Sequence, residues 1–383
     1  MNPVPLGLYI HWPYCARICP YCDFNVYKAG RNETGPLYEA LLADLALWRD
    51  LTGPRPLASI HFGGGTPSLM APQHIEGLIG AAEQLFGLEP DAEIGLEANP
   101  AELAHFGDIA RAGVGRLSIG MQALDDGALK RLGRDHDAAL ALNAFDTARD
   151  LFARVSADLI YAREGQGPAD WKAELSAMLS RAPDHLSLYQ LTIEPGTAFD
   201  RQMARGTLRP PGEEDAAEMF ETTQELTQAA GLEAYEISNH ARGEAHRSRH
   251  NRLYWTGGDW IGIGPGAHGR LGSHVTGGRR ASAAPLRPAD YGEAVKAGRL
   301  AWAEPLGALE EAQERILMGL RISEGLDRTT LKAATGHDID EDAARQHAGA
   351  GFITLDEARV ALTASGRIYA DRIAMDLAPS ADA

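Results

Sequence analysis

Apolar runs alternate with helical stretches along the first 240 residues of the chain. Such alternation, with helices of about 10–15 residues, is typical of βαβ units whose strands lie parallel in one sheet. We therefore predict an α/β domain of six units, although the pattern alone does not separate a partial barrel from a doubly wound sheet. The predicted strands are Leu6–Trp12, Leu57–Phe62, Ala92–Glu97, Arg116–Gln122, Arg154–Tyr161 and His185–Thr192.

The strand–helix pattern stops near residue 240. Residues 239–285 are rich in Gly, His, Arg, Trp and Tyr and show no clear element, so we predict a long functional loop there. Helical stretches resume near Pro305, and a strand-like pair follows at Phe352–Asp356 and Arg359–Leu362, which is similar to a small winged-helix module. The predicted division is a core domain (1–240), a linking region (241–304) and a C-terminal helical, winged-helix-like domain (305–383).

The composition excludes several classes of protein. The 383 residues include 36 basic and 53 acidic side chains, for a net charge of −17. A general basic field for DNA or RNA is therefore absent, and we expect no nucleic-acid partner. No run of about 18 apolar residues predicts a transmembrane segment. The N-terminus lacks the basic and apolar regions of a secretory signal, so we expect a cytoplasmic protein.

All three cysteines fall within eight residues, as Cys15-x3-Cys19-x2-Cys22. An odd number of cysteines this close together does not form a disulfide framework. Thiolates are soft ligands that suit iron–sulfur clusters, zinc or copper(I). A [4Fe–4S] cluster normally takes four thiolates, so three would leave one iron open to a small molecule. The alternatives are cysteines without a ligand and a zinc site completed by His11.

Glycines and polar residues stand at the ends of the other predicted strands. Gly63–Thr66 follows the second strand, Glu97 ends the third and Gln122 ends the fourth, while Asp158 and Tyr161 lie in the fifth. Ligands of parallel sheets bind at the carboxyl ends of the strands, so we expect these residues to meet the cysteines at one pocket. A glycine run there would let the backbone approach a ligand closely.

The cysteine spacing after the first strand and Gly-Gly-Gly-Thr-Pro after the second together resemble the radical S-adenosylmethionine (SAM) superfamily. This resemblance implies a partial (β/α)6 barrel, with a [4Fe–4S] cluster on Cys15, Cys19 and Cys22. The open iron would be chelated by SAM. An electron from the cluster would then cleave the sulfonium and give a 5′-deoxyadenosyl radical.

A longer series of motifs, from Leu6 to about Leu377, resembles the HemN/HemW group of that superfamily. HemN is the oxygen-independent coproporphyrinogen III oxidase, and HemW proteins are heme chaperones. Phe24 stands where the oxidase has a fourth cysteine, the oxidase has a longer arm before its first cysteine, and residues 250–255 match HNxxYW, so the chaperones are favoured. The alternatives are the oxidase and a HemN-like methyltransferase. The motifs are YIHWPYC, CDF, GGGTPS, EANP, SIGMQ, LGRDHD, DLIY, HLSLYQLTIEPGT, YEISN and HNRLYW.

The resemblance assigns the polar residues at the strand ends to SAM. The glycine run would line the methionine amino group, Glu97 would pair with the ammonium, and Arg134 would contact the carboxylate or the ribose, because a guanidinium binds a carboxylate bidentately. One departure is YAREGQ at residues 161–166, where relatives usually have a YGLPGQ-like turn. The predicted cofactor-binding residues are Tyr9, Gly64, Gly65, Thr66, Glu97, Gln122, Arg134 and Asp158.

The HNxxYW motif implies a heme site. His250 would ligate the iron, since heme is commonly held by a histidine, and Tyr254 and Trp255 would pack on the porphyrin. The alternative for His250 is a hydrogen-bonded structural histidine. Arg249 and Arg252 could meet the propionates. The rival ligands in the same region are His240, His246 and His268.

The resemblance also implies partners and a location. Heme would pass from the chain to respiratory hemoproteins, and a homodimer would be linked to the cluster and SAM. The implied protein is cytoplasmic and lacks coproporphyrinogen oxidase activity. It would contact membrane-bound respiratory enzymes through partner proteins, because an acidic chain gains little from anionic lipid.

Overall fold

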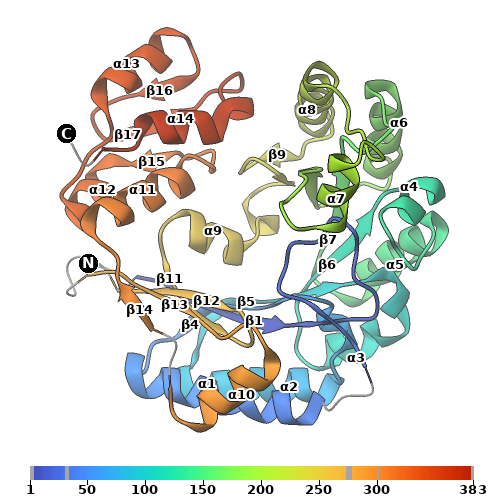
Figure 1. The fold of residues 1–383 in the computed structure, drawn as a ribbon, viewed down its shortest axis with the longest axis vertical. Coiled ribbons are helices and arrows are strands. Elements are labelled where there is room, and N and C mark those ends of the chain that lie inside the picture. The colour runs from blue at the N-terminus through green and yellow to red at the C-terminus, as the bar shows by residue number, and fades with distance from the viewer. Residues whose placement is uncertain (1–3, 31–33, 273–277, 300–301, 381–383) are drawn as a thin grey trace.

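The computed structural model describes residues 4–30, 34–272, 278–299 and 302–380 (Figure 1). Their frame is a twelve-stranded sheet in the order β14-β13-β12-β11-β1-β4-β5-β6-β7-β8-β10-β9. The strands from β11 to β8 in this order are parallel, which confirms the predicted parallel α/β core. These strands are β1 (Leu6–Trp12), β4 (Leu57–Gly64), β5 (Leu88–Ala98), β6 (Arg116–Gln122), β7 (Arg154–Tyr161), β8 (His185–Gln190) and β11 (Asp259–Ile263).

Antiparallel strands extend the sheet at both edges. On the β11 side they are β12 (His268–Leu271), β13 (Arg280–Ala283) and β14 (Trp302–Pro305). On the β8 side they are β10 (Asn239–Ala241) and β9 (Glu233–Ala234). A separate two-stranded pair, β2 (Tyr14–Cys15) and β3 (Tyr27–Lys28), forms within the cysteine loop.

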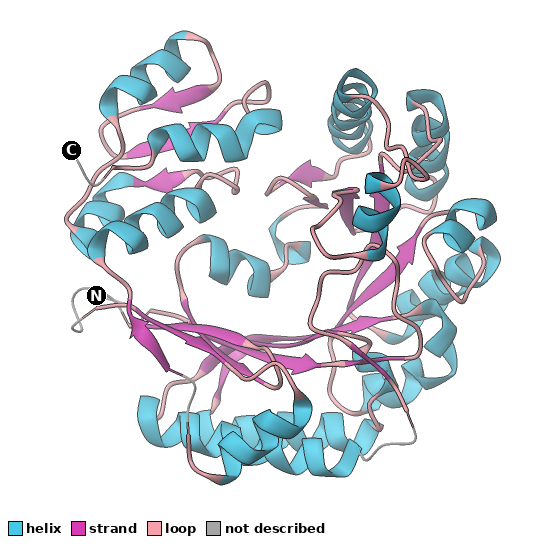
Figure 2. Ribbon diagram, in the orientation of Figure 1, coloured by secondary structure: helices cyan, strands magenta, loops and turns pink. Residues whose placement is uncertain are grey.

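The sheet curves without closing, and helices cover its convex face (Figures 1 and 2). In the first helix, Leu37, Leu41, Leu45 and Trp48 recur at helical spacing and are buried against the sheet, which is the pattern of an amphipathic helix. The helices of the barrel are α1 (Thr34–Thr52), α2 (Pro72–Phe86), α3 (Phe106–Arg111), α4 (Asp126–Arg131), α5 (Ala138–Leu151), α6 (Pro168–Leu179), α7 (Ala198–Ala204), α8 (Glu213–Ala229) and α10 (Pro288–Lys296).

The predicted loop over residues 239–285 is wrong, because this segment contains β10, α9 (Arg249–Trp255) and β11 to β13. β11 is buried along its whole length, so it shows no alternation of apolar and polar residues. It also needs glycine: a Cβ on Gly262 would lie 2.1 Å from the carbonyl oxygen of His268. The described strands β11 to β14 therefore extend the main sheet beside β1.

The C-terminal part packs around its own apolar core, which includes Ile316, Leu331, Val360 and Ile373. It combines four helices with a three-stranded antiparallel sheet in the order β15-β17-β16, as the predicted winged-helix-like domain requires. The elements are α11 (Ala308–Gly319), β15 (Leu326–Asp327), α12 (Arg328–Thr335), α13 (Glu341–Gly349), β16 (Ile353–Leu355), β17 (Arg359–Leu362) and α14 (Ala370–Leu377).

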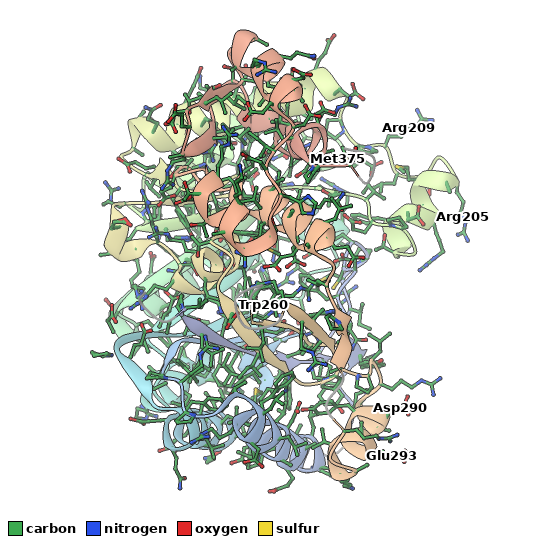
Figure 3. The ribbon with its side chains drawn as sticks, turned by 90° about the vertical axis from the view of Figure 1, so that its left-hand side faces the viewer. Arg205, Arg209, Trp260, Asp290, Glu293 and Met375 are labelled. Carbon is green, nitrogen blue, oxygen red and sulfur yellow. The ribbon has the colours of Figure 1, made fainter. Side chains whose placement is uncertain are left out.

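The C-terminal domain and α10 lie toward opposite ends of the molecule (Figure 3). Met375 of α14 marks the first, and Asp290 and Glu293 mark the second, whereas Arg205 and Arg209 project outward beyond α7. None of the helices in the described ranges is long and apolar enough to span a bilayer.

Candidate functional site

A cavity of about 420 Å³ opens at the carboxyl ends of β4 to β8, where the cysteine loop covers them. Most of the residues that were expected to meet at the strand ends therefore line one cavity. Tyr9 and His250 are the two predicted site residues that do not line this cavity. The predicted residues that do line it are Cys15, Cys19, Cys22, Gly64, Gly65, Thr66, Glu97, Gln122, Arg134 and Asp158.

The three cysteines face the cavity as free thiols. Burial raises the pKa of the Cys15 thiol and raises that of Cys22 to about 11, so a cluster that binds here must displace protons. Arg134 Nη1 donates to Cys19 Sγ at 3.4 Å, so a positive charge lies beside this sulfur. Within the described ranges, no three His, Cys, Asp or Glu side chains are grouped so as to hold a single metal ion.

His11 is not placed to complete a zinc site with the cysteines. Its Nε2 lies 2.9 Å from the carbonyl oxygen of Asn25, and its Nδ1 lies 3.1 Å from the hydroxyl of Tyr9. Both ring nitrogens thus have partners, and His11 does not line the cavity. A loop that offers three thiols and an open position fits an iron–sulfur cluster better than a closed zinc site.

The glycine run lines the cavity directly beside the start of the cysteine loop. Gly64 has φ +104°, which a side chain rarely tolerates, and its N–H donates to Glu97 Oε2 at 3.2 Å. A Cβ on Gly65 would lie 2.7 Å from the carbonyl oxygen of Tyr14 and 2.8 Å from that of Trp12. The run can therefore lie against the cysteine loop only because these residues are glycines.

Asp158 lies at the base of the cavity with a set of serine donors. Ser118 Oγ donates to its two oxygens at 3.0 and 2.9 Å, and Ser156 Oγ donates at 3.1 Å. Burial raises the pKa of Asp158, while these hydroxyls stabilise the carboxylate. The arrangement fixes an acceptor that could receive the hydroxyls of a ribose.

Gln122 has a strained backbone in the cavity wall. Its φ is +68°, it follows a register shift in β6, and its buried Oε1 has no partner in the part of the chain that the structure describes. Such bulges and strained residues are frequent beside functional sites. Arg163, which is 6% exposed, donates to the Gln122 carbonyl at 3.3 Å and pairs with Glu174. The sequence signal for Arg163 is the unusual YAREGQ segment.

Asn99 and Asp135 also line the cavity; the segment Glu97–Pro100 was expected there, but neither residue was given a role from the sequence. Asn99 Oδ1 accepts from Arg134 Nη2 at 3.1 Å, and its Nδ2 donates to Asp135 at 3.0 Å. Hydrogen bonding from His136 is the main cause that lowers the pKa of Asp135. Both residues stand in motifs visible in the sequence, EANP and LGRDHD, but their spacing gave no indication that they would hold Arg134 in place.

His250 lies in a stack of rings on the concave side of the sheet, behind the cavity. It is 2% exposed, its Nδ1 lies 3.3 Å from Ser59 Oγ, and burial lowers its pKa well below the ordinary value. Its ring stacks on His61 at 4.4 Å and meets Tyr254 edge-on at 4.5 Å. Tyr9 stacks on both imidazoles. In this arrangement no face of His250 is open to a heme, and its role as a ligand stays a prediction.

The rival histidines differ in their access to solvent. His240 is fully buried, His246 is half-buried and His268 is exposed. The arginines of the motif already have acidic partners: Arg249 pairs with Glu89 and Asp91. Arg252 pairs with Glu244 and with Glu324, each at 2.8 Å.

Comparisons with known proteins agree with the fold described above. The model of the radical SAM superfamily matches residues 9–176, and that of the HemN C-terminal domain matches residues 306–369. Coproporphyrinogen III oxidase (HemN) from Escherichia coli has a TM-score of 0.82 at 22% identity, covering 98% of this chain and 90% of its own. At that identity the likeness shows the fold.

Curated relatives show the family. The radical S-adenosyl methionine domain-containing protein 1 of mouse mitochondria is 42% identical over 336 residues, which is 84% of this chain and 74% of the relative. The heme chaperone HemW of Mycobacterium tuberculosis is 35% identical over 97% of this chain and 95% of its own length. That of Bacillus subtilis is 31% identical over 95% and 97%. The chain belongs to the HemW family within the radical SAM superfamily.

Proposed function

We propose that this protein is a heme chaperone that holds a [4Fe–4S] cluster and SAM in the cavity and passes heme to respiratory hemoproteins. The observation that carries the proposal is the cavity itself, in which a three-thiol loop faces the glycine run. Phe24 lines its rim, with 62% of the residue exposed, at the place of the oxidase's fourth cysteine. The curated relatives named heme chaperone HemW support the same function.

The cavity offers a complementary group for each part of the cofactor pair. Cys15, Cys19 and Cys22 would hold three irons, and Glu97 beside the glycine run would hold the ammonium of SAM. Arg134 would meet the SAM carboxylate, with Gln122, Thr66 and Asp158 as further polar contacts. The reduced cluster supplies the electron that can cleave the sulfonium of bound SAM.

We place the heme outside this cavity, because the cluster and SAM would fill it. His268 is exposed on β12, and the segment before it contacts the cysteine loop: Asn25 Nδ2 donates to the carbonyl oxygen of Pro265 at 2.9 Å. The same Asn25 amide also donates to the carbonyl oxygen of Leu286 at 2.8 Å, and Leu286 is 61% exposed. His268 is thus the histidine of the four that best combines access with nearness to the cluster loop.

The test is an absorbance titration with hemin on anaerobically reconstituted protein. We expect a near-stoichiometric Soret shift in the wild type, weakened by His268→Ala and retained in the exposed control His105→Ala. Loss in His250→Ala alone, with unchanged melting, would return the ligand to the HNxxYW motif. The absence of specific binding would overturn the chaperone function, and so would turnover of coproporphyrinogen III.

The remaining proposals concern partners and location. A homodimer and a cytoplasmic location with contact to membrane-bound respiratory enzymes through partner proteins would suit a carrier of heme. Methyl transfer from labelled SAM would instead support the alternative methyltransferase. Sedimentation of the reconstituted protein with and without SAM tests the homodimer, the methyl-transfer assay tests the methyltransferase, and cell fractionation tests the location.

A further inference from the structure

The HNRLYW segment forms α9, a helix that lies on the concave side of the sheet (Figures 1 and 2). One face of α9 is buried against β1 and β4, the two strands that precede the cysteine loop and the glycine run. Leu253 and His250 are buried on this face. The Leu253 side chain lies so close to β1 that a Cβ on Gly7 would be 3.2 Å from Leu253 Cδ1. The motif therefore packs under the strands that carry the cavity, in an arrangement in which no face of the His250 ring is open.

A chain of contacts runs from α9 to the cavity wall. The His250 ring stacks on His61 with a centroid distance of 4.4 Å and an angle of 13°. His61 Nε2 lies 3.3 Å from Glu97 Oε1, and Glu97 Oε2 accepts the N–H of Gly64 at 3.2 Å. His61 Nδ1 has no partner among the described residues, so the hydrogen bond from Nε2 to Glu97 is what orients the ring. His250 itself is held by Ser59.

From this geometry we propose that His250 is a positioning residue for SAM, acting through His61 on Glu97. Glu97 receives one fixed donor on each oxygen, which sets the direction in which its charge meets a ligand ammonium. The His250 ring packs on the face of His61 and is itself held by Tyr254, so it opposes rotation of the His61 ring away from Glu97. The inference rests on the proposed binding of SAM in this cavity and gives the HNxxYW motif a role that needs no iron.

The test measures SAM binding to the reconstituted full-length protein by equilibrium dialysis and by the EPR change of the reduced cluster. We expect His250→Ala to weaken binding about tenfold, the lower range for groups that orient a ligand contact. His250→Phe keeps a flat ring on His61 and should bind within about twofold of the wild type. His74→Ala is the matched control, because His74 also stacks on an aromatic ring, at 4.2 Å on Tyr38, away from Glu97.

A double-mutant cycle separates positioning from a general loss of structure. If His250 acts through Glu97, His250→Ala should cause no further loss of affinity in a Glu97→Gln background, because the coupling passes through that carboxylate. Additive losses would overturn the inference, as would wild-type affinity in His250→Ala. No SAM binding by the wild type would overturn the proposed function together with this inference. Heme binding lost in both His250→Ala and His250→Phe, with SAM binding unchanged, would show a ligand role instead.

Discussion

At the scale of single residues, the burial of Asp44 makes the stability of the protein depend on pH. Asp44 of α1 is 5% exposed, and its Oδ2 accepts the hydroxyl of Tyr291 at 2.8 Å. That hydroxyl in turn accepts the N–H of Gly264 at 3.1 Å. Burial raises the pKa of Asp44 to about 7, even though the Tyr291 hydrogen bond favours the charged form.

Asp44→Asn should therefore stabilise the protein at alkaline pH. Between pH 4 and 7 the folded state keeps the Asp44 proton while the unfolded state loses it, so wild-type stability falls as pH rises and the loss is complete above pH 7. The amide keeps the acceptor for Tyr291 but has no charge to bury. Urea denaturation should show the advantage of the variant growing by about 2 kcal/mol from pH 5 to pH 8. The exposed Asp50→Asn should show no such growth, and a pH-independent difference would refute the argument.

At the scale of elements, α9 begins at a buried carboxylate from β5. Glu93 is fully buried; its Oε1 accepts Ser248 Oγ at 3.3 Å and the His250 N–H at 3.1 Å. Its Oε2 accepts the Arg249 N–H at 3.2 Å and pairs with Arg154 at 3.0 Å. A negative charge at a helix N-terminus is favourable, so one side chain of the sheet sets where the helix starts.

Glu93→Gln should loosen α9 and destabilise the fold. The amide cannot accept from all these donors and leaves the Arg154 charge partly buried without its partner, at a cost of about 3 kcal/mol. Thermal and urea unfolding measure this loss, and SAM affinity should fall in parallel, as in His250→Ala. Glu89→Gln, at a half-exposed partner of Arg249, should cost less than about 1 kcal/mol. Equal effects of the two substitutions would contradict the role given to Glu93.

At the scale of the whole molecule, charged pairs join the C-terminal domain to the barrel, beside an apolar contact of Met318 with the cluster of Leu253 and Trp260. Glu324 of the C-terminal domain receives Arg247 at 3.0 Å and Arg252 at 2.8 Å from the α9 region. Arg321 lies 3.5 Å from Glu236, and Arg367 donates to the Glu236 carbonyl. Charged pairs with partial exposure are weakened by salt, whereas apolar cores are not.

Glu324→Gln should loosen the C-terminal domain without unfolding the barrel. Two arginines then lose their shared carboxylate, at a cost of about 1 kcal/mol for this partly exposed group. Hydrogen exchange should accelerate over residues 306–377, and 1 M NaCl should have a similar effect on the wild type. Asp376→Asn, which breaks pairs inside the domain, should leave junction segments 233–241 and 247–256 unchanged. Faster exchange spread evenly over both cores would count against an independent domain.

Features encoded by local patterns could be predicted from the sequence. The βα alternation fixed the parallel core, and the cysteine spacing and glycine run indicated one shared site, because strand ends of a parallel sheet meet at one edge. β11 escaped prediction because a short strand buried on both faces shows no alternation. The roles of Asn99 and Arg163 escaped it too, since each acts on another residue through contacts between segments distant in the chain.

The sequence by itself determined the strand–helix units, the three-thiol loop, the glycines and the family, since these depend on residue type and local spacing. Only the tertiary structure decided that β11 to β14 complete the sheet and that the HNRLYW helix packs against β1 and β4. It also decided which histidines are buried. The physical reason is that burial and hydrogen-bond partners arise between distant segments: His250 contacts His61 because β4 and α9 pack together, and no spacing along the chain encodes that contact.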